Sequence, residues 1–183
     1  MLEELYSQLA YRFGLDLEAQ AKTRSRMSTV WKTLRWLAII VVCLFVVAQF
    51  FGPAKTNPAV DQAQTLQART HVSPQVATIL ERSCGDCHSN NTRWPWYSNV
   101  APVSWFVISH VEDGRRDMNF SEWGQYDARR QSGRLQQICR EVKSGSMPLS
   151  SYTPLHPGTK LTPEDVKVLC DWANEERTRI AAR

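Results

Sequence analysis

The chain has 183 residues, and its 22 Lys and Arg are nearly balanced by 18 Asp and Glu. This length is enough for one ordinary domain once non-globular ends are set aside. Neutralising the phosphates of a nucleic acid requires a dense basic patch, and a nearly balanced chain excludes nucleic acid as a partner.

The first 26 residues form a polar to amphipathic segment with Leu2, Leu5, Leu9 and Phe13 at helical spacing. This spacing predicts a helix on the cytoplasmic side. The alternative is that Met27 is the true start and that residues 1–26 are an upstream over-extension.

An uncharged apolar run extends from Trp36 to Phe51. A bilayer is spanned by about 20 apolar residues, and flanking Trp31 and Leu34 lengthen the run toward that value. We therefore predict a signal anchor over residues 27–51, with residues 36–51 in the lipid bilayer. The alternative is a cleaved signal peptide, because Val46-Val47-Ala48 fits a small-residue cleavage rule.

Basic residues are concentrated on the N-terminal side of this run. By the positive-inside rule, the part of the chain from residue 52 onward lies outside the cytoplasm. The prediction is a single-pass protein of a bacterial inner membrane with a periplasmic C-terminal domain. The basic residues are Lys22, Arg24, Arg26, Lys32 and Arg35.

Residues 52–72 are rich in Pro, Gln, Thr and Ala with little apolar periodicity, which predicts a linker. The domain is expected over residues 73–183. In this domain, an N-cap residue followed by proline at the first helical position marks the start of the first and the last expected helices. No useful apolar/polar alternation occurs, so the fold class is predicted as all-α. The expected helices begin at Ser73, after Pro102, near Asp127 and at Thr162, and the second and third end at Gly114 and Gly145.

Residues Cys84-Gly85-Asp86-Cys87-His88 form a C-x-x-C-H motif, the attachment site of a c-type haem. Two thiols with two residues between them on a helical turn can reach the two vinyl groups of a porphyrin, and the adjacent imidazole becomes the proximal iron ligand. A thioredoxin-like pair would follow a strand, and a zinc site would need two further ligands at suitable spacing. The sequence shows neither. We predict one covalently bound haem c, attached through Cys84 and Cys87, with His88 on the iron.

Met147 is the predicted sixth ligand, because it follows the helix end at Gly145 and precedes Pro148 in a late loop. Met/His ligation raises the reduction potential and suits electron transfer. The alternatives are His110, which would give bis-His ligation, then Met118, or an ordinary packing role for Met147.

Arg93, Trp94 and Trp96 follow the motif closely and are predicted to contact the haem, with Arg93 as a donor to the propionates. Trp94, Trp96, Trp105 and Trp123 lie within thirty residues, and they form either a small aromatic core or the walls of a pocket for a flat ligand.

Two further cysteines, Cys139 and Cys170, lie on the apolar stripes of two separate predicted helices. They form either a disulfide, in an oxidising compartment, or two buried free thiols.

The sequence resembles the bacterial haem-binding domain family of small membrane-anchored proteins over about residues 36–175. The resemblance implies one covalent haem c, His88 as its proximal ligand, an extracytoplasmic domain of cytochrome c type, and Met147 at the family's Met-Pro position. The 26-residue head departs from the family's usual short lead into the anchor. The matching segments are CGDCHSNNTRWPWYSNVAPVSW, HVEDGRRDMNFSEWGQY and VKSGSMPLSSYTPLHPGTKLTPED.

The predicted function is one-electron transfer by a membrane-anchored mono-haem cytochrome c, with membrane complexes and periplasmic redox proteins as partners. Tethering favours this role because it raises the effective concentration near membrane complexes. An electron carrier has no catalytic residues of its own. Two alternatives are a peroxidase-like or gas-binding haem protein, and a haem subunit of a larger membrane complex.

Overall fold

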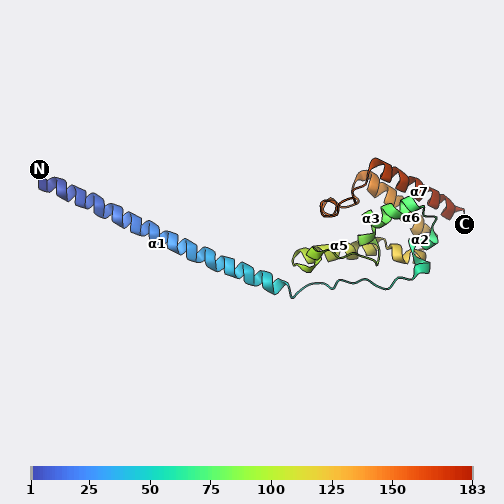
Figure 1. The fold of residues 1–183 in the computed structure, drawn as a ribbon, viewed down its shortest axis with the longest axis horizontal. Coiled ribbons are helices and arrows are strands. Elements are labelled where there is room, and N and C mark those ends of the chain that lie inside the picture. Colours follow the sequence, from blue (N-terminus) through green and yellow to red (C-terminus); the bar gives the residue numbers. More distant parts are fainter. Residues whose placement is uncertain (1, 183) are drawn as a thin grey trace. The chain divides into compact units, whose positions relative to one another are not determined.

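The computed structural model describes residues 2–182 and divides into two units, Met1–Phe51 and Gly52–Arg183. The first unit is one helix, α1 (Leu2–Ala48), shown in blue in Figure 1. Within it, Lys22–Ala48 is long and apolar enough to cross a membrane, by length and composition. The amphipathic head and the apolar run as far as Ala48 therefore belong to one continuous helix.

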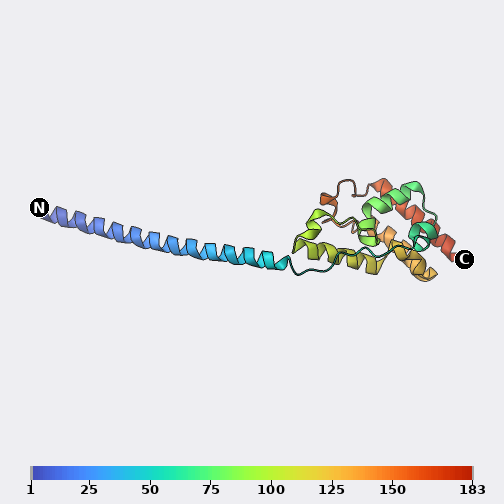
Figure 2. The ribbon, with the colours of Figure 1, turned by 60° about the horizontal axis from the view of Figure 1, so that its bottom comes forward.

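The second unit is built from helices alone, and no strand occurs in residues 2–182 (Figures 1 and 2). The all-α prediction is confirmed. The α-helices are α2 (Leu66–Arg69), α3 (Pro74–Ser83), α4 (Gly85–His88), α5 (Val103–Asp117), α6 (Ala128–Ser144) and α7 (Pro163–Ala181). The 3-10 turns are η1 (Gln62–Gln64), η2 (Trp96–Asn99), η3 (Phe120–Gln125) and η4 (Thr153–Leu155).

The helix boundaries follow from local capping chemistry. The Ser73 side chain accepts a hydrogen bond from the backbone of α3, and Thr162 forms a capping box with Asp165 at the start of α7. Gly145 ends α6 at φ 73°, a left-handed conformation that favours glycine. These three boundaries agree with the sequence prediction, whereas α5 continues past Gly114 to Asp117.

The core of the second unit is formed by the inner faces of the helices and η3. A disulfide joins Cys139 of α6 to Cys170 of α7, so these cysteines are not free thiols. The link ties together the two helices that flank residues 145–162, the segment containing Met147. The most buried core residues are Leu66, Ile79, Leu80, Trp123, Leu135, Leu169 and Ala173.

The expected linker differs from the structure, because part of it packs into the domain. Leu66 is fully buried in the core. Arg115 of α5 donates hydrogen bonds to the Thr56 carbonyl at 2.8 Å and to the Asn57 side chain at 3.0 Å. Trp94 donates to the same Asn57 oxygen at 3.2 Å. Residues 52–60, which we call the strap, are thus fastened along the domain.

Candidate haem site

The C-x-x-C-H motif occupies the junction between α3 and α4. The Cys84 backbone N–H donates to Leu80 at the end of α3, and the Cys84 carbonyl then accepts from Cys87 and His88 at 3.2 and 3.0 Å. This single turn brings two thiols and an imidazole to one side of the chain, as the sequence spacing predicts.

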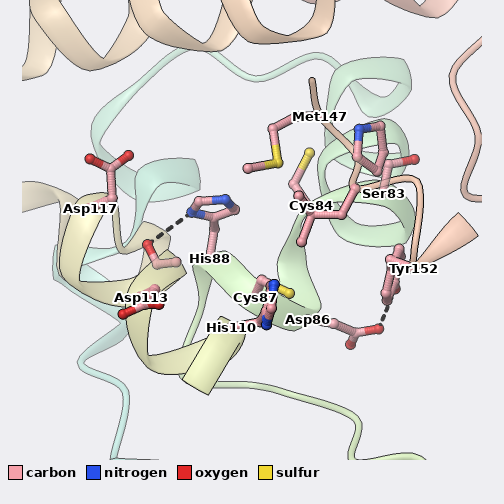
Figure 3. Close-up of a pocket in the computed structure, with 13 residues that line it drawn as sticks. Ser83, Cys84, Asp86, Cys87, His88, His110, Asp113, Asp117, Met147 and Tyr152 are labelled. Atoms are coloured by element: carbon pink, nitrogen blue, oxygen red, sulfur yellow. Dashed lines mark hydrogen bonds between the residues drawn. The ribbon is translucent and has the colours of Figure 1, made fainter. Parts of the chain in front are cut away.

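A cavity of about 270 Å³ adjoins this turn (Figure 3). Cys84, Cys87 and His88 line it, and Met147 enters it from the loop after α6. The structure therefore brings together the predicted attachment cysteines, the predicted proximal histidine and the predicted sixth ligand. The remaining lining residues are Ser83, Asp86, His110, Asp113, Gly114, Asp117, Pro148, Leu149 and Tyr152.

The ring of His88 is oriented by its backbone contacts. Its Nδ1 lies 3.0 Å from the carbonyl oxygens of both Gly114 and Met118. A carbonyl only accepts, so Nδ1 carries the proton and Nε2 keeps its lone pair. Burial lowers the pKa of His88, which favours the neutral ring. A neutral imidazole held by hydrogen bonds at its other nitrogen is the form that binds a metal ion.

Both motif thiols stay protonated in this environment. Burial, reinforced by the neighbouring Cys87, raises the pKa of Cys84 to about 12. Burial and the nearby Asp86 raise the pKa of Cys87 to about 11. Redox-active C-x-x-C cysteines have lowered pKa values instead. This difference argues against the thioredoxin-like alternative.

Gly114 allows α5 to approach the motif closely. A Cβ atom at this position would lie 2.6 Å from the Cys87 carbonyl oxygen, which is shorter than any normal contact. The same residue supplies one of the carbonyls that hold His88. Glycine is therefore required here for packing.

Asp86, between the two cysteines, connects the motif to two other segments. Its carboxylate accepts a 3.0 Å hydrogen bond from the Arg93 Nε, at ion-pair distance. It also accepts a 2.7 Å bond from the hydroxyl of Tyr152, in the segment after Met147. Sequence reasoning missed the roles of Asp86 and Tyr152, because no local pattern marks a contact between residues 66 positions apart.

None of the three residues predicted to contact the haem, Arg93, Trp94 and Trp96, lines the first cavity. Arg93 lines a second hollow of about 180 Å³ that shares Asp86 and Cys87 with the first. Trp94 bonds to the strap, and the Trp96 side chain is 77% exposed. No tryptophan lines the first cavity, and Trp123 is in the core. The haem contacts of Arg93, Trp94 and Trp96 stay predictions.

The two rival sixth ligands occupy different places. The Met118 side chain is buried in the core, 6% exposed, and its carbonyl holds His88. His110 lines the cavity from α5, and its Nδ1 is 2.8 Å from the Phe106 carbonyl. His88 is fixed by carbonyls at the end of the same helix, whereas Met147 comes from the loop after α6.

An all-helical domain with a metal-competent histidine, two thiols and a thioether around one cavity has the residues of a haem-binding protein. The chain belongs to the haem-binding domain family, whose model matches residues 43–175. The resemblance seen in the sequence is thereby confirmed. Neither a curated protein nor a solved structure matches the chain.

Proposed function

We propose that this protein is a membrane-anchored mono-haem c-type cytochrome that transfers electrons outside the cytoplasm. The observation that carries the proposal is the arrangement at His88. Its Nδ1 donates to two backbone carbonyls at 3.0 Å. Its Nε2 is therefore available to bind iron, in a cavity that Met147 also lines.

Cys84 and Cys87 would hold the haem covalently. Each thiol would add across one vinyl double bond, with sulfur bonding to one carbon and the hydrogen going to the other, so that no oxidant would be consumed. Protonated, cavity-lining thiols suit this addition. Cys84, Cys87 and His88 lie on one helical turn, so together they would hold the haem at one place in the fold.

Met147 would complete the coordination as a soft thioether. Haem iron supplies one-electron redox chemistry when bound, and Met/His ligation raises its reduction potential. The disulfide between α6 and α7 and the hydrogen bond from Tyr152 to Asp86 restrain the loop that contains Met147. A ligand sphere that changes little between oxidation states suits a carrier.

Four features support a periplasmic location in a bacterial inner membrane. The apolar part of α1 is long enough to span a bilayer, and a basic cluster, Lys22, Arg24, Arg26, Lys32 and Arg35, precedes its apolar run. The Cys139–Cys170 disulfide fits an oxidising compartment. Haem c is also attached outside the cytoplasm. Periplasmic redox proteins and membrane complexes are the proposed partners.

The proposal is tested by expressing the full chain together with a c-type maturation system and measuring whether the haem is covalently bound. Haem should remain with the denatured protein through acid–acetone extraction, and a Cys84→Ser, Cys87→Ser variant should lose it. Cys43→Ser is the control, because Cys43 lies in the apolar helix and not at the cavity. Freely extractable wild-type haem would refute the c-type proposal.

A further inference from the structure

Within residues 52–182, the part of the domain that the structure describes, five large hydrophobic side chains are exposed. They lie at one end of the domain. Val103, Phe106 and Leu155 border the second hollow, and Tyr97, which stacks edge-on against Trp96, borders it too. Figures 1 and 2 show the start of α5 and the segment around η4 at the same end of the domain. We call this set the apolar face: Trp96, Val103, Trp105, Phe106 and Leu155.

The sequence that forms most of this face has no charge. Between Arg93 and Glu112 the chain contains no Asp, Glu, Lys or Arg. The segment includes η2 and most of α5, both at the surface. A surface stretch without charges can enter a low-dielectric environment without the cost of removing ions from water.

The strap connects this face to the apolar helix. A Cβ atom built on Gly52 would lie 3.0 Å from the indole nitrogen of Trp105, so the strap begins against the apolar face. Lys55 then bonds to Asn99 of η2. Because Phe51 and Gly52 are joined by one peptide bond, the apolar face lies within a few residues of the end of the proposed membrane span.

We infer that the apolar face binds the lipid surface, with Trp96, Trp105 and Phe106 in the headgroup and upper acyl region of the membrane that holds the helix. Tryptophan is enriched at this depth because its ring is apolar with one polar N–H. The strap is hydrogen-bonded to the domain from Lys55 to Asn57, so only a few residues separate these bonds from the end of the helix. This inference rests on the proposed membrane anchor.

The orientation has a consequence for the haem. The second hollow contains Cys87 and is bordered by the apolar face. Docking this face on lipid would direct the Cys87 side of the haem site toward the membrane and leave the α6–α7 side in water. Electron exchange with membrane complexes would then be favoured over exchange with freely diffusing proteins.

The test uses the full-length holoprotein in vesicles of phosphatidylethanolamine and phosphatidylglycerol that contain a diazirine-labelled phospholipid. After illumination, lipid adducts are mapped by mass spectrometry. We expect adducts on residues 30–51 and also on residues 96–106. Trp96→Ser and Phe106→Ser variants should lose the second group and keep the first, and the haem spectrum reports whether each variant is folded.

The outcomes separate the two proposals. Adducts on the helix alone would overturn the lipid-docking inference and keep the anchor, and the apolar face would then serve a protein partner. Absence of adducts from the helix would overturn the anchor itself. The wild-type map is decisive even if a variant fails to fold.

Discussion

The hydroxyl of Tyr152 donates a 2.7 Å hydrogen bond to Asp86, a buried carboxylate between the two motif cysteines. Tyr152 lies five residues after Met147, so the bond links the loop of the proposed sixth ligand to the turn proposed to attach the haem. Tyr152 also stacks on His156 with ring centroids 3.8 Å apart. Its ring is therefore fixed from two sides.

Replacing Tyr152 with Phe should loosen Met147 while leaving the shape of the site intact. A hydrogen bond to a charged group contributes about 1.5–3 kcal/mol, so the urea midpoint of the holoprotein should fall. Carbon monoxide should bind the ferrous protein faster than in wild type, because the thioether leaves the iron more often. Stopped-flow absorption measures that rate.

Tyr97→Phe is the matched control for this substitution. His156 donates from Nδ1 to the Tyr152 carbonyl, so its Nε2 accepts the Tyr97 hydroxyl at 3.2 Å. A neutral bond of this kind contributes about 0.5–1.5 kcal/mol, and it does not involve the motif. Equal carbon monoxide rates in the two variants would show that the Tyr152–Asp86 bond does not restrain Met147.

Gly114→Ala should destabilise the protein through its backbone contact with the motif. The new methyl group would lie 2.6 Å from the Cys87 carbonyl, so α5 must move and the bonds that orient His88 must lengthen. Overpacking of this kind costs about 1–3 kcal/mol. Urea unfolding monitored by haem absorption measures the loss.

The same substitution at Gly133 of α6 provides the comparison. A Cβ atom there has no neighbour within 4 Å. Alanine in a helix interior is favoured over glycine by about 1 kcal/mol, so Gly133→Ala should keep or raise the stability. A Gly114→Ala variant as stable as Gly133→Ala would contradict the close approach of α5 to Cys87.

The sequence predicted well those features that depend on neighbouring residues. Ser73, Thr162 and Gly145 act on the nearest turn of backbone, and the motif spacing fixes Cys84, Cys87 and His88 on one turn. Such signals operate over a few residues and can be read directly from the chain.

Contacts between distant segments could not be predicted in this way. Residues 52–72 were predicted as a linker from their polar composition. That composition gave no indication that Leu66 is fully buried or that Arg115 forms hydrogen bonds to the strap. The ion pair of Arg93 with Asp86 was likewise not predicted, and the expected contact of Arg93 with a haem propionate stays a prediction. A single charged residue has many possible partners, and only the tertiary fold selects one.

The orientation of the chain gives a further prediction. A reporter that is active only in the periplasm, fused after Arg183, should be active, because the basic residues retain the N-terminal side in the cytoplasm. Salt washing should leave the protein in the membrane fraction. The same reporter at Arg26 should be inactive. A soluble form that begins near Gln49 would instead indicate a cleaved signal peptide.

The sixth ligand determines whether the protein is a carrier, and Met147→Ala tests it. A thioether favours the ferrous state, so wild type should show the near-infrared charge-transfer band of Met-ligated ferric haem. Without the thioether, the iron should become high spin, its reduction potential should fall, and carbon monoxide should bind readily. Absorption spectroscopy and a redox titration measure these changes.

His110→Ala is the variant to compare with Met147→Ala, because the side chains of His110 and Met147 both line the cavity. We expect it to leave the spectrum nearly unchanged, since His110 comes from α5, the same helix whose end fixes His88, whereas Met147 comes from a separate loop after α6. The reverse pattern, with His110→Ala disturbing the iron and Met147→Ala having no effect, would establish bis-His ligation and a lower potential. If neither substitution changes the spectrum, the iron is five-coordinate in wild type. An open coordination position would then favour a peroxidase-like or gas-binding protein over an electron carrier.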